Sequence, residues 1–177
     1  MADRKRNVSV IILAGGKSTR MGEDKRLVTI HQKTLVRYAL ETLFPLTSDI
    51  VISSDDALPE FEGYLCIPDN IPHMGPLQGV ISAMPYCKYD QIIVRSCDMP
   101  FVPASLFQEL LSLHHKQVTL PVHEGRVQPL CGIYRKDIHH EIQSLFQAGK
   151  HSMHEVIETL STAYVPVKLL HTNITSY

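Results

Sequence analysis

The sequence lacks three features that would each assign the protein to a class. It has no excess of positive charge, because 17 Lys and Arg residues stand against 18 Asp and Glu residues for a formal net charge of -1. This balance argues against a nucleic-acid binder that works through a broad basic face. It has no run of about 20 apolar residues, the length that a membrane span needs, and the apolar run at residues 8–14 is too short for a signal-peptide core. We therefore expect a soluble, cytoplasmic protein that binds neither nucleic acid nor a membrane.

The usual patterns of metal ligands and nucleophiles are also lacking. The ten histidines form no set with Cys or Glu at zinc-site spacing, so solvated helix surface is their expected place. No Ser-His-Asp or Cys-His arrangement can be argued from the sequence. The cysteines form no Cys-x-x-Cys pair and each lies in an apolar stretch, which predicts reduced thiols in the core and a reducing compartment. They are Cys66, Cys87, Cys97 and Cys131.

Regular alternation of strand-like and helix-like runs is the main feature that the sequence does have. Its 177 residues, 44% of them apolar, suit one compact domain spanning residues 1–177, with residues 1–7 as a flexible N-terminal tail. The alternation predicts a three-layer α/β/α Rossmann-like fold with a mostly parallel mixed sheet. The predicted strands are residues 8–14, 49–54, 64–67, 91–97, 118–122, 128–134 and 163–167, and the predicted helices are residues 34–44, 77–84, 106–114, 138–147 and 154–160.

Such a sheet also predicts where a ligand binds. In open α/β sheets, ligands lie outside the carboxyl ends of the strands. We therefore expect the functional site in the segments that directly follow predicted strands, which are residues 14–25, 53–56, 67–79 and 97–103.

The first of these segments belongs to a glycine-rich string, LAGGKSTRMGEDK, at residues 13–25. Glycines let the backbone approach a ligand closely, exposed N–H groups form an anion nest, and the cations Lys17, Arg20 and Lys25 can neutralise phosphate charge. A Walker A loop is excluded because Ile11 stands where that motif requires glycine, and the G-x-G-x-x-G dinucleotide fingerprint is absent. The alternative is a tight glycine turn with a solvated basic face, but the full string favours triphosphate binding.

The string L-A-G-G-x-S-x-R-M-G-x-D-K resembles the signature loop of the sugar-nucleotide-type nucleotidyltransferases. Its double glycine and its Asp24–Lys25 ending most resemble the molybdenum cofactor guanylyltransferases. The resemblance implies the nucleotide-diphospho-sugar transferase fold and Mg²⁺-dependent transfer of GMP from GTP to the phosphate of Mo-molybdopterin, with release of pyrophosphate. It also implies that Arg20 and Lys25 hold the phosphates, Lys25 stabilising transition-state charge, and that the nucleotide contacts Leu13, Ala14, Gly15 and Gly16.

Two aspartates follow later predicted strands. Asp98 comes directly after the strand at residues 91–97, and a carboxylate there is suited to hold Mg²⁺ against phosphates. The alternative is that Asp98 caps the helix that starts near Pro103, but its D-x-P pattern matches the family. Asp69 stands ahead of G-P-L-x-G at residues 75–79, where the family has a nucleotide-contacting aspartate. From the residues alone, Asp69 is equally well read as an Asx-turn residue.

The acceptor side is assigned by resemblance to the second half of the chain. GRVQPLCGIYR at residues 125–135 resembles the family strand that lines the acceptor side of the cleft, although a core hairpin is an equal alternative. Asn173 matches the first asparagine of a C-terminal family element associated with the pterin, while Thr175 stands where the second would be. The predicted acceptor-binding residues are Gly75, Gln128 and Asn173.

Three alternatives to the guanylyltransferase stay open. The first is a cytidylyl or sugar-phosphate nucleotidyltransferase of the same fold, and the serines of ISSDD, where the family often has an asparagine near the base, leave guanine selection open. The second is a non-catalytic GTP-binding regulator. The third, a P-loop GTPase or redox dinucleotide enzyme, lacks its fingerprint here. By resemblance, the expected partners are GTP, Mo-molybdopterin and, transiently, cofactor biosynthesis proteins or molybdoenzyme chaperones.

Overall fold

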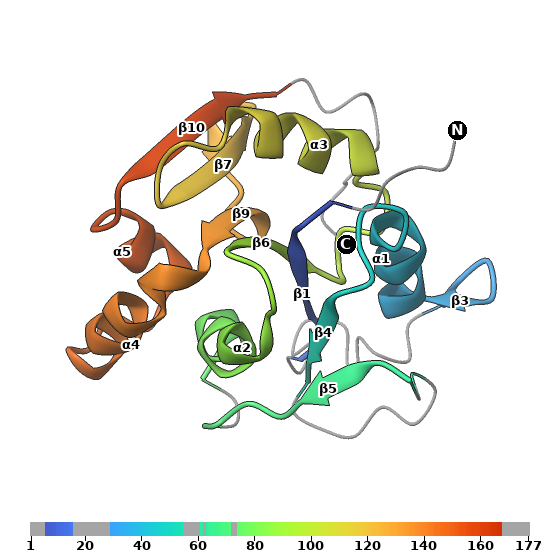
Figure 1. The fold of residues 1–177 in the computed structure, drawn as a ribbon, viewed down its shortest axis with the longest axis horizontal. Coiled ribbons are helices and arrows are strands. Elements are labelled where there is room, and N and C mark those ends of the chain that lie inside the picture. The colour runs from blue at the N-terminus through green and yellow to red at the C-terminus, as the bar shows by residue number, and fades with distance from the viewer. Residues whose placement is uncertain (1–5, 16–28, 55–60, 62, 72–73, 168–177) are drawn as a thin grey trace.

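The computed structural model describes residues 6–15, 29–54, 61, 63–71 and 74–167. Its centre is a sheet with strand order β10-β7-β9-β6-β1-β4-β5, with β8 paired to β7 outside this path (Figure 1). The neighbours β6, β1, β4 and β5 run parallel, whereas β9 runs antiparallel to both β6 and β7. The predicted mostly parallel mixed sheet is confirmed. The strands are β1 Ser9–Leu13, β4 Ile50–Ser53, β5 Leu65–Ile67, β6 Gln91–Ser96, β7 Val118–His123, β8 Arg126–Val127, β9 Cys131–Arg135 and β10 Thr162–Pro166, beside a small hairpin of β2 Thr29–Ile30 and β3 Lys33–Thr34.

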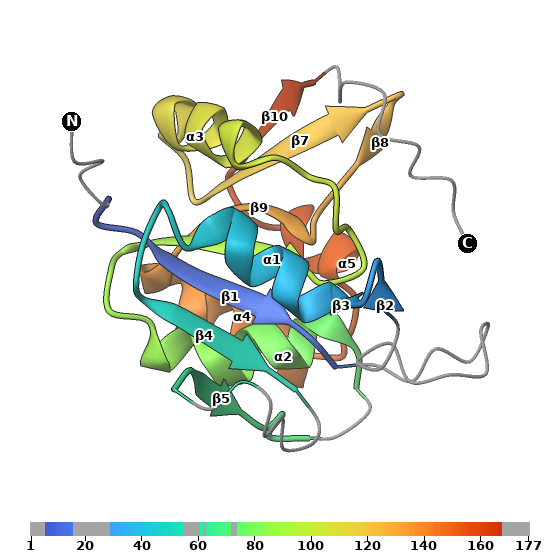
Figure 2. The same cartoon turned by 90° about the vertical axis from the view of Figure 1, so that its right-hand side faces the viewer.

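Helices cover both faces of the sheet, as the three-layer prediction requires (Figure 2). Helices α1 and α3 pack on one face, while α2, α4 and α5 pack on the other. All five residues of β1 are buried, with Val10 and Ile12 packed in one hydrophobic cluster and Ile11 and Leu13 in the other. Burial on both faces explains why the strands read as continuously apolar runs. The helices are α1 Leu35–Leu43, α2 Pro76–Ala83, α3 Ala104–Leu113, α4 His139–Gln147 and α5 Met153–Ile157, with 3₁₀ turns η2 Met84–Tyr86 and η3 Lys136–Ile138.

The predicted strand at residues 128–134 begins later in the structure, because residues 128–130 lie outside any strand and β9 starts at Cys131. The turn at Glu124 and Gly125 joins β7 to β8, and a second turn precedes β9. Pro129 lies in this second turn, and proline has no N–H to donate to a strand ladder. The turn is held from inside by Tyr134, whose buried hydroxyl donates to the Pro129 carbonyl at 2.6 Å. Residues 128–130 therefore form a turn of fixed conformation beside the carboxyl end of β6.

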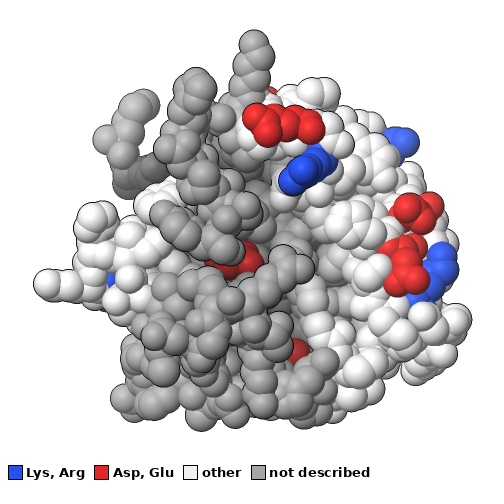
Figure 3. Space-filling model, turned by 180° about the vertical axis from the view of Figure 1, so that it is seen from behind, with Lys and Arg blue, Asp and Glu red and all other residues white. Residues whose placement is uncertain are grey.

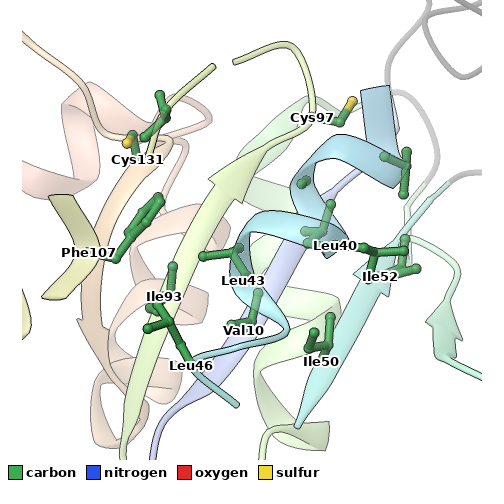
Figure 4. Close-up of a cluster of buried hydrophobic side chains, with 14 of the residues drawn as sticks. Val10, Leu40, Leu43, Leu46, Ile50, Ile52, Ile93, Cys97, Phe107 and Cys131 are labelled. Carbon is green, nitrogen blue, oxygen red and sulfur yellow. The ribbon is translucent and has the colours of Figure 1, made fainter. Parts of the chain in front are cut away.

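Three of the four cysteines confirm the prediction of core thiols, and Cys66 does not. Cys87, Cys97 and Cys131 are buried, whereas Cys66 is half-buried because β5 is an edge strand. All four are free. Burial raises the pKa of Cys87 and of Cys131 to about 12, so these thiols stay protonated at neutral pH. Cys97 and Cys131 both belong to the cluster under α1 and α3 (Figure 4).

None of the helices in the described part of the chain is long and apolar enough to cross a membrane.

Candidate functional site

The order of the strands creates a switch point between β1 and β6. From β1 the chain continues through α1 to β4 and then β5 on one side, and from β5 it returns through α2 to β6 on the other side of β1. The carboxyl ends of β1 and β6 therefore lie side by side while their connections diverge. In open α/β sheets this is the place where a crevice for ligands forms.

Backbone hydrogen bonds hold the ends of the neighbouring strands in one row. The register sets Leu13 opposite both Ser53 of β4 and Ser96 of β6. The Cys97 N–H donates to the Leu13 carbonyl at 3.1 Å, which fixes the residue before Asp98 against the end of β1. On the other side, the Ala14 N–H donates to the Ser53 carbonyl at 2.8 Å. The predicted nucleotide-binding residues Leu13, Ala14 and Gly15 are thus held between the segments that carry Asp98 and Asp69.

Asp98 lies on the turn that follows β6, and its side chain is exposed. The interpretation of Asp98 as a helix cap is wrong, because α3 begins at Ala104 with Pro103 as its N-cap and has no side-chain cap hydrogen bond. The carboxylate is instead placed at the carboxyl edge of the sheet, where the sequence predicted a ligand. This position suits contact with a cation bound beside a ligand at this edge.

Asp69 is fixed by a hydrogen bond across two strands. The Ser53 hydroxyl, buried at the end of β4, donates to Asp69 Oδ1 at 2.7 Å. The following residue is also anchored, because the Asn70 N–H donates to Ser82 Oγ of α2 at 2.9 Å. The half-buried carboxylate therefore has one oriented oxygen at the same edge as Asp98.

Gly79 allows α2 to approach these residues closely. A Cβ at this position would lie 2.6 Å from Ser53 Oγ, 3.0 Å from Leu13 Cδ2 and 3.3 Å from Asp69 Oδ1. The glycine thus lets the helix pack on the ends of β1 and β4 and on the Ser53–Asp69 hydrogen bond. No other residue fits there without a shift of the helix or of Ser53.

Two of the three predicted acceptor residues can be placed. Gly75 is exposed, has φ +82° and forms the N-cap of α2 ahead of Pro76. Gln128 lies in the turn before β9, where its N–H donates to the Pro121 carbonyl at 3.0 Å. Because the Ser96 N–H donates to Leu130 at 2.9 Å, this turn adjoins the carboxyl end of β6. The structure therefore brings the Gln128 turn to the side of β6 away from β1.

Four predicted site residues, Gly16, Arg20, Lys25 and Asn173, lie outside the described residues.

The donors at this edge fit Mg²⁺ better than a transition metal. The described residues contain no group of three or more His, Cys, Asp and Glu side chains that could hold a metal by themselves. Magnesium needs few protein ligands, since it takes phosphate oxygens and water for the rest of its shell. The exposed carboxylate of Asp98 and the oriented carboxylate of Asp69 are oxygen donors of this kind.

Charges of both signs occur among the described residues on one face of the molecule. On the face shown in Figure 3, the basic and acidic side chains of the described residues lie singly or in small groups of both signs. The described residues on this face form no broad basic patch.

Sequence reasoning placed Ser53 and Gly79 in segments expected to bind a ligand but did not foresee their contacts, and it did not single out Arg95. Ser53 orients Asp69, Gly79 makes room for that contact, and Arg95 lies buried beneath the turn that carries Asp98. A serine ending a buried strand and a single arginine within the apolar run of β6 were the available signals.

Comparisons with known proteins agree with this geometry. Residues 10–164 match the family model described as the MobA-like NTP transferase domain. A protein of Flavobacterium johnsoniae named "Probable molybdenum cofactor guanylyltransferase" is 31% identical over 166 residues, which cover 93% of this chain and 85% of that protein.

Solved structures share the fold. The molybdopterin-guanine dinucleotide biosynthesis protein A of Archaeoglobus fulgidus superposes with a TM-score of 0.75 at 24% identity, covering 90% of this chain and 83% of that one. The 2-C-methyl-D-erythritol 4-phosphate cytidylyltransferase of Thermus thermophilus superposes with a TM-score of 0.68 at 14% identity, covering 93% of each chain. The fold alone therefore does not select the base or the acceptor.

Proposed function

Because the chain belongs to the MobA-like NTP transferase family, we propose that it is a Mg²⁺-dependent guanylyltransferase that transfers GMP from GTP to the phosphate of Mo-molybdopterin. The observation that carries the proposal is the hydrogen bond between Cys97 N–H and the Leu13 carbonyl, which joins the start of the glycine-rich loop to the segment of Asp98. The name of the 31% identical relative supports the acceptor and the base.

In this proposal, GTP lies across the carboxyl edge of the sheet. The backbone of Leu13, Ala14 and Gly15 contacts the nucleotide, and Asp69 meets it from the side of β5. The sequence assigns the side chains of Arg20 and Lys25 to the phosphates. These cations neutralise the negative charge of the phosphates as that charge moves toward the pyrophosphate leaving group. Positioning and charge neutralisation of this kind account for most of the catalysis of phosphoryl-group transfer.

An oxygen of the acceptor phosphate attacks the α-phosphorus of GTP in line. A new P–O bond forms while the bond from the α-phosphorus to the bridging oxygen of the β-phosphate breaks, and pyrophosphate leaves. The acceptor phosphate is already ionised at neutral pH, so no side chain has to remove a proton. Asp98 would hold the Mg²⁺, whose chemistry there is to neutralise and orient the phosphate oxygens. The turn at Gln128, beside the end of β6, faces the acceptor.

We extend the proposal to the setting of the reaction. The chain acts as one nucleotidyltransferase domain in the cytoplasm, and its product is received by cofactor biosynthesis proteins or molybdoenzyme chaperones.

Pyrophosphate release tests the proposal directly. The purified protein is given Mg²⁺ and each of the four NTPs, with and without Mo-molybdopterin. We expect release that requires both GTP and the cofactor. Release with CTP, or with a sugar phosphate as acceptor, would move the protein to a sister enzyme of the same fold, and GTP binding without release would make it a regulator.

Two variants test the assigned residues within the same assay. Asp98→Asn and Lys25→Ala should each lower turnover by about 10²- to 10³-fold, because each removes charge stabilisation of the transition state. Asp137→Asn is the matched control, since this exposed aspartate pairs with Arg135 at the opposite edge of the sheet. Near wild-type turnover in either site variant would remove that residue from the mechanism.

A further inference from the structure

Arg95 is an unusual residue to find inside the sheet. It lies on β6, three positions before Asp98, and its side chain is fully buried. Within the described part of the chain it forms no ion pair, and its guanidinium carbon lies 6.0 Å from the ring centroid of Phe107 on α3. Burial lowers the pKa of this arginine to about 10, which reflects the cost of holding its charge away from water.

With the described residues the guanidinium makes two hydrogen bonds, and both go to the turn after Asp98. Arg95 Nη2 donates to the Met99 carbonyl at 2.9 Å and to the Pro100 carbonyl at 3.2 Å. Its Nε and Nη1 are buried and have no hydrogen-bond partner among the residues that the structure describes. Of the guanidinium nitrogens, only Nη2 therefore donates hydrogen bonds to the described residues, and it donates them to two successive carbonyls of one turn.

A contribution to folding stability does not explain why an arginine is buried at this position. An apolar side chain of similar length would fill the same space between β6 and α3 without a buried charge and without unpaired donors, and such replacements of buried charged groups are often neutral or stabilising. What an apolar side chain could not do is fix the direction of the Met99 and Pro100 carbonyls. Those carbonyls belong to the residues directly after Asp98.

We propose that Arg95 is a positioning residue, which holds the turn at Met99 and Pro100 so that Asp98 presents its carboxylate to the nucleotide-bound cation. The inference rests on the proposed function of Asp98. A shift of about 1 Å in a catalytic group can cost about 10²-fold in rate. The loss of both carbonyl contacts frees the turn for a shift of this size.

The decisive variant is Arg95→Met, which keeps most of the side-chain volume and removes every donor. We expect it to unfold at the same or a higher denaturant concentration than the wild type, yet to lose turnover about tenfold or more and to need about tenfold more Mg²⁺ for half-maximal activity. Arg95→Lys keeps a cation that can donate to the two carbonyls, so it should recover most of the turnover without a gain in stability.

A measurement of cation binding tests the role of Arg95 without relying on turnover. Mn²⁺ binding in the presence of GTP, followed by electron paramagnetic resonance, should weaken about tenfold in Arg95→Met and recover in Arg95→Lys. Ile93→Met is the matched control, because Ile93 is buried two positions earlier on β6, in the cluster that contains Phe107, and its side chain has no donor to lose. In an Asp98→Asn background, Arg95→Met should weaken Mn²⁺ binding no further.

Amide hydrogen exchange supplies a readout that needs no ligand. The amides of residues 97–102 should exchange faster in Arg95→Met than in the wild type, while the rest of β6 stays protected. The inference is overturned if Arg95→Met keeps wild-type Mn²⁺ affinity and exchange, or if its losses match a fall in stability. Failure of the wild type to release pyrophosphate from GTP and Mo-molybdopterin would instead overturn the proposed function, and the exchange result would still decide the role of Arg95.

Discussion

Replacing Gly79 with alanine should lower the free energy of unfolding, whereas the same substitution raises it in an ordinary helix. Within a helix, alanine is favoured over glycine by about 0.8–1 kcal/mol. Gly79 lies within α2, but a Cβ there would stand 2.6 Å from Ser53 Oγ and 3.0 Å from Leu13 Cδ2. Overpacking of this kind costs about 1–3 kcal/mol. Displacement of Ser53 would also break its buried hydrogen bond to Asp69, at a further cost of about 1–3 kcal/mol.

After the helix preference for alanine is subtracted from these two costs, the net expectation for Gly79→Ala is a loss of about 1–5 kcal/mol in the free energy of unfolding. In a domain of this size, that lowers the melting temperature by about 2–4 °C for each kcal/mol. The same displacement moves Asp69, so GTP affinity should fall by about tenfold. Urea unfolding and titration with GTP measure the two effects separately.

Two further variants make the reasoning specific to the contact. Ser53→Ala removes the oxygen that the new Cβ would meet, so the double variant Gly79→Ala with Ser53→Ala should regain about 1 kcal/mol relative to additivity. Gly132→Ala is the control for overpacking alone, because a Cβ there would overlap Leu120 Cδ2 within the sheet and would not touch Asp69. It should lower stability without weakening GTP binding by the folded protein.

The reasoning fails if Gly79→Ala is more stable than the wild type, or if the double variant shows no coupling. Either result would mean that α2 moves aside at little cost and that Gly79 does not hold the Ser53–Asp69 contact in place.

Two other predictions concern the second half of the chain. Tyr134→Phe removes the buried 2.6 Å hydrogen bond to the Pro129 carbonyl and should lower the free energy of unfolding by about 1–2 kcal/mol in urea titrations; an unchanged value would mean that the turn before β9 needs no anchor. For His114, burial, with smaller contributions from Arg135 and His115, lowers the pKa of the imidazole from 6.5, so the unfolded chain takes up the proton first as the pH falls. The contribution of neutral His114 to stability is complete above pH 6.5 and is lost as the pH falls toward the lowered pKa. In His114→Gln, the free energy of unfolding should therefore decline less steeply between about pH 7 and 5 than in the wild type. Equal slopes in the two proteins would refute the assignment.

Much of the fold could be predicted from the sequence because the sheet is buried on both faces. A strand such as β1 then needs apolar residues at every position, and such a run stands out from the periodic pattern of α1. The location of Asp98 followed from the same pattern, because the end of an apolar strand marks the edge where ligands bind. Boundaries were less predictable where short elements depend on neighbours, as at Pro129 between β8 and β9.

The contacts within the site could not be predicted in the same way. The Ser53–Asp69 hydrogen bond joins residues 16 positions apart, and it exists only because β4 and β5 pair in one register. The role of Gly79 depends on how closely α2 approaches that pair. Arg95 shows the limit most clearly: the sequence reveals an arginine among apolar residues, but only the path of its side chain reveals that it holds the Met99 and Pro100 carbonyls.

Because β9 runs antiparallel to β6, the acceptor specificity of this enzyme class could change through a turn and not through a strand. A parallel neighbour of β6 would bring its last residue and the start of a crossover to the edge of Asp98. Because β9 runs antiparallel, it brings there the short turn that precedes it, which contains Gln128. Turns tolerate insertion and substitution far better than the strands that they join. If the Gln128 turn faces the acceptor as proposed, lengthening it would reshape the acceptor side and leave the row from Leu13 to Asp98 unchanged. The nucleotide half and the acceptor half of the site could then diverge independently.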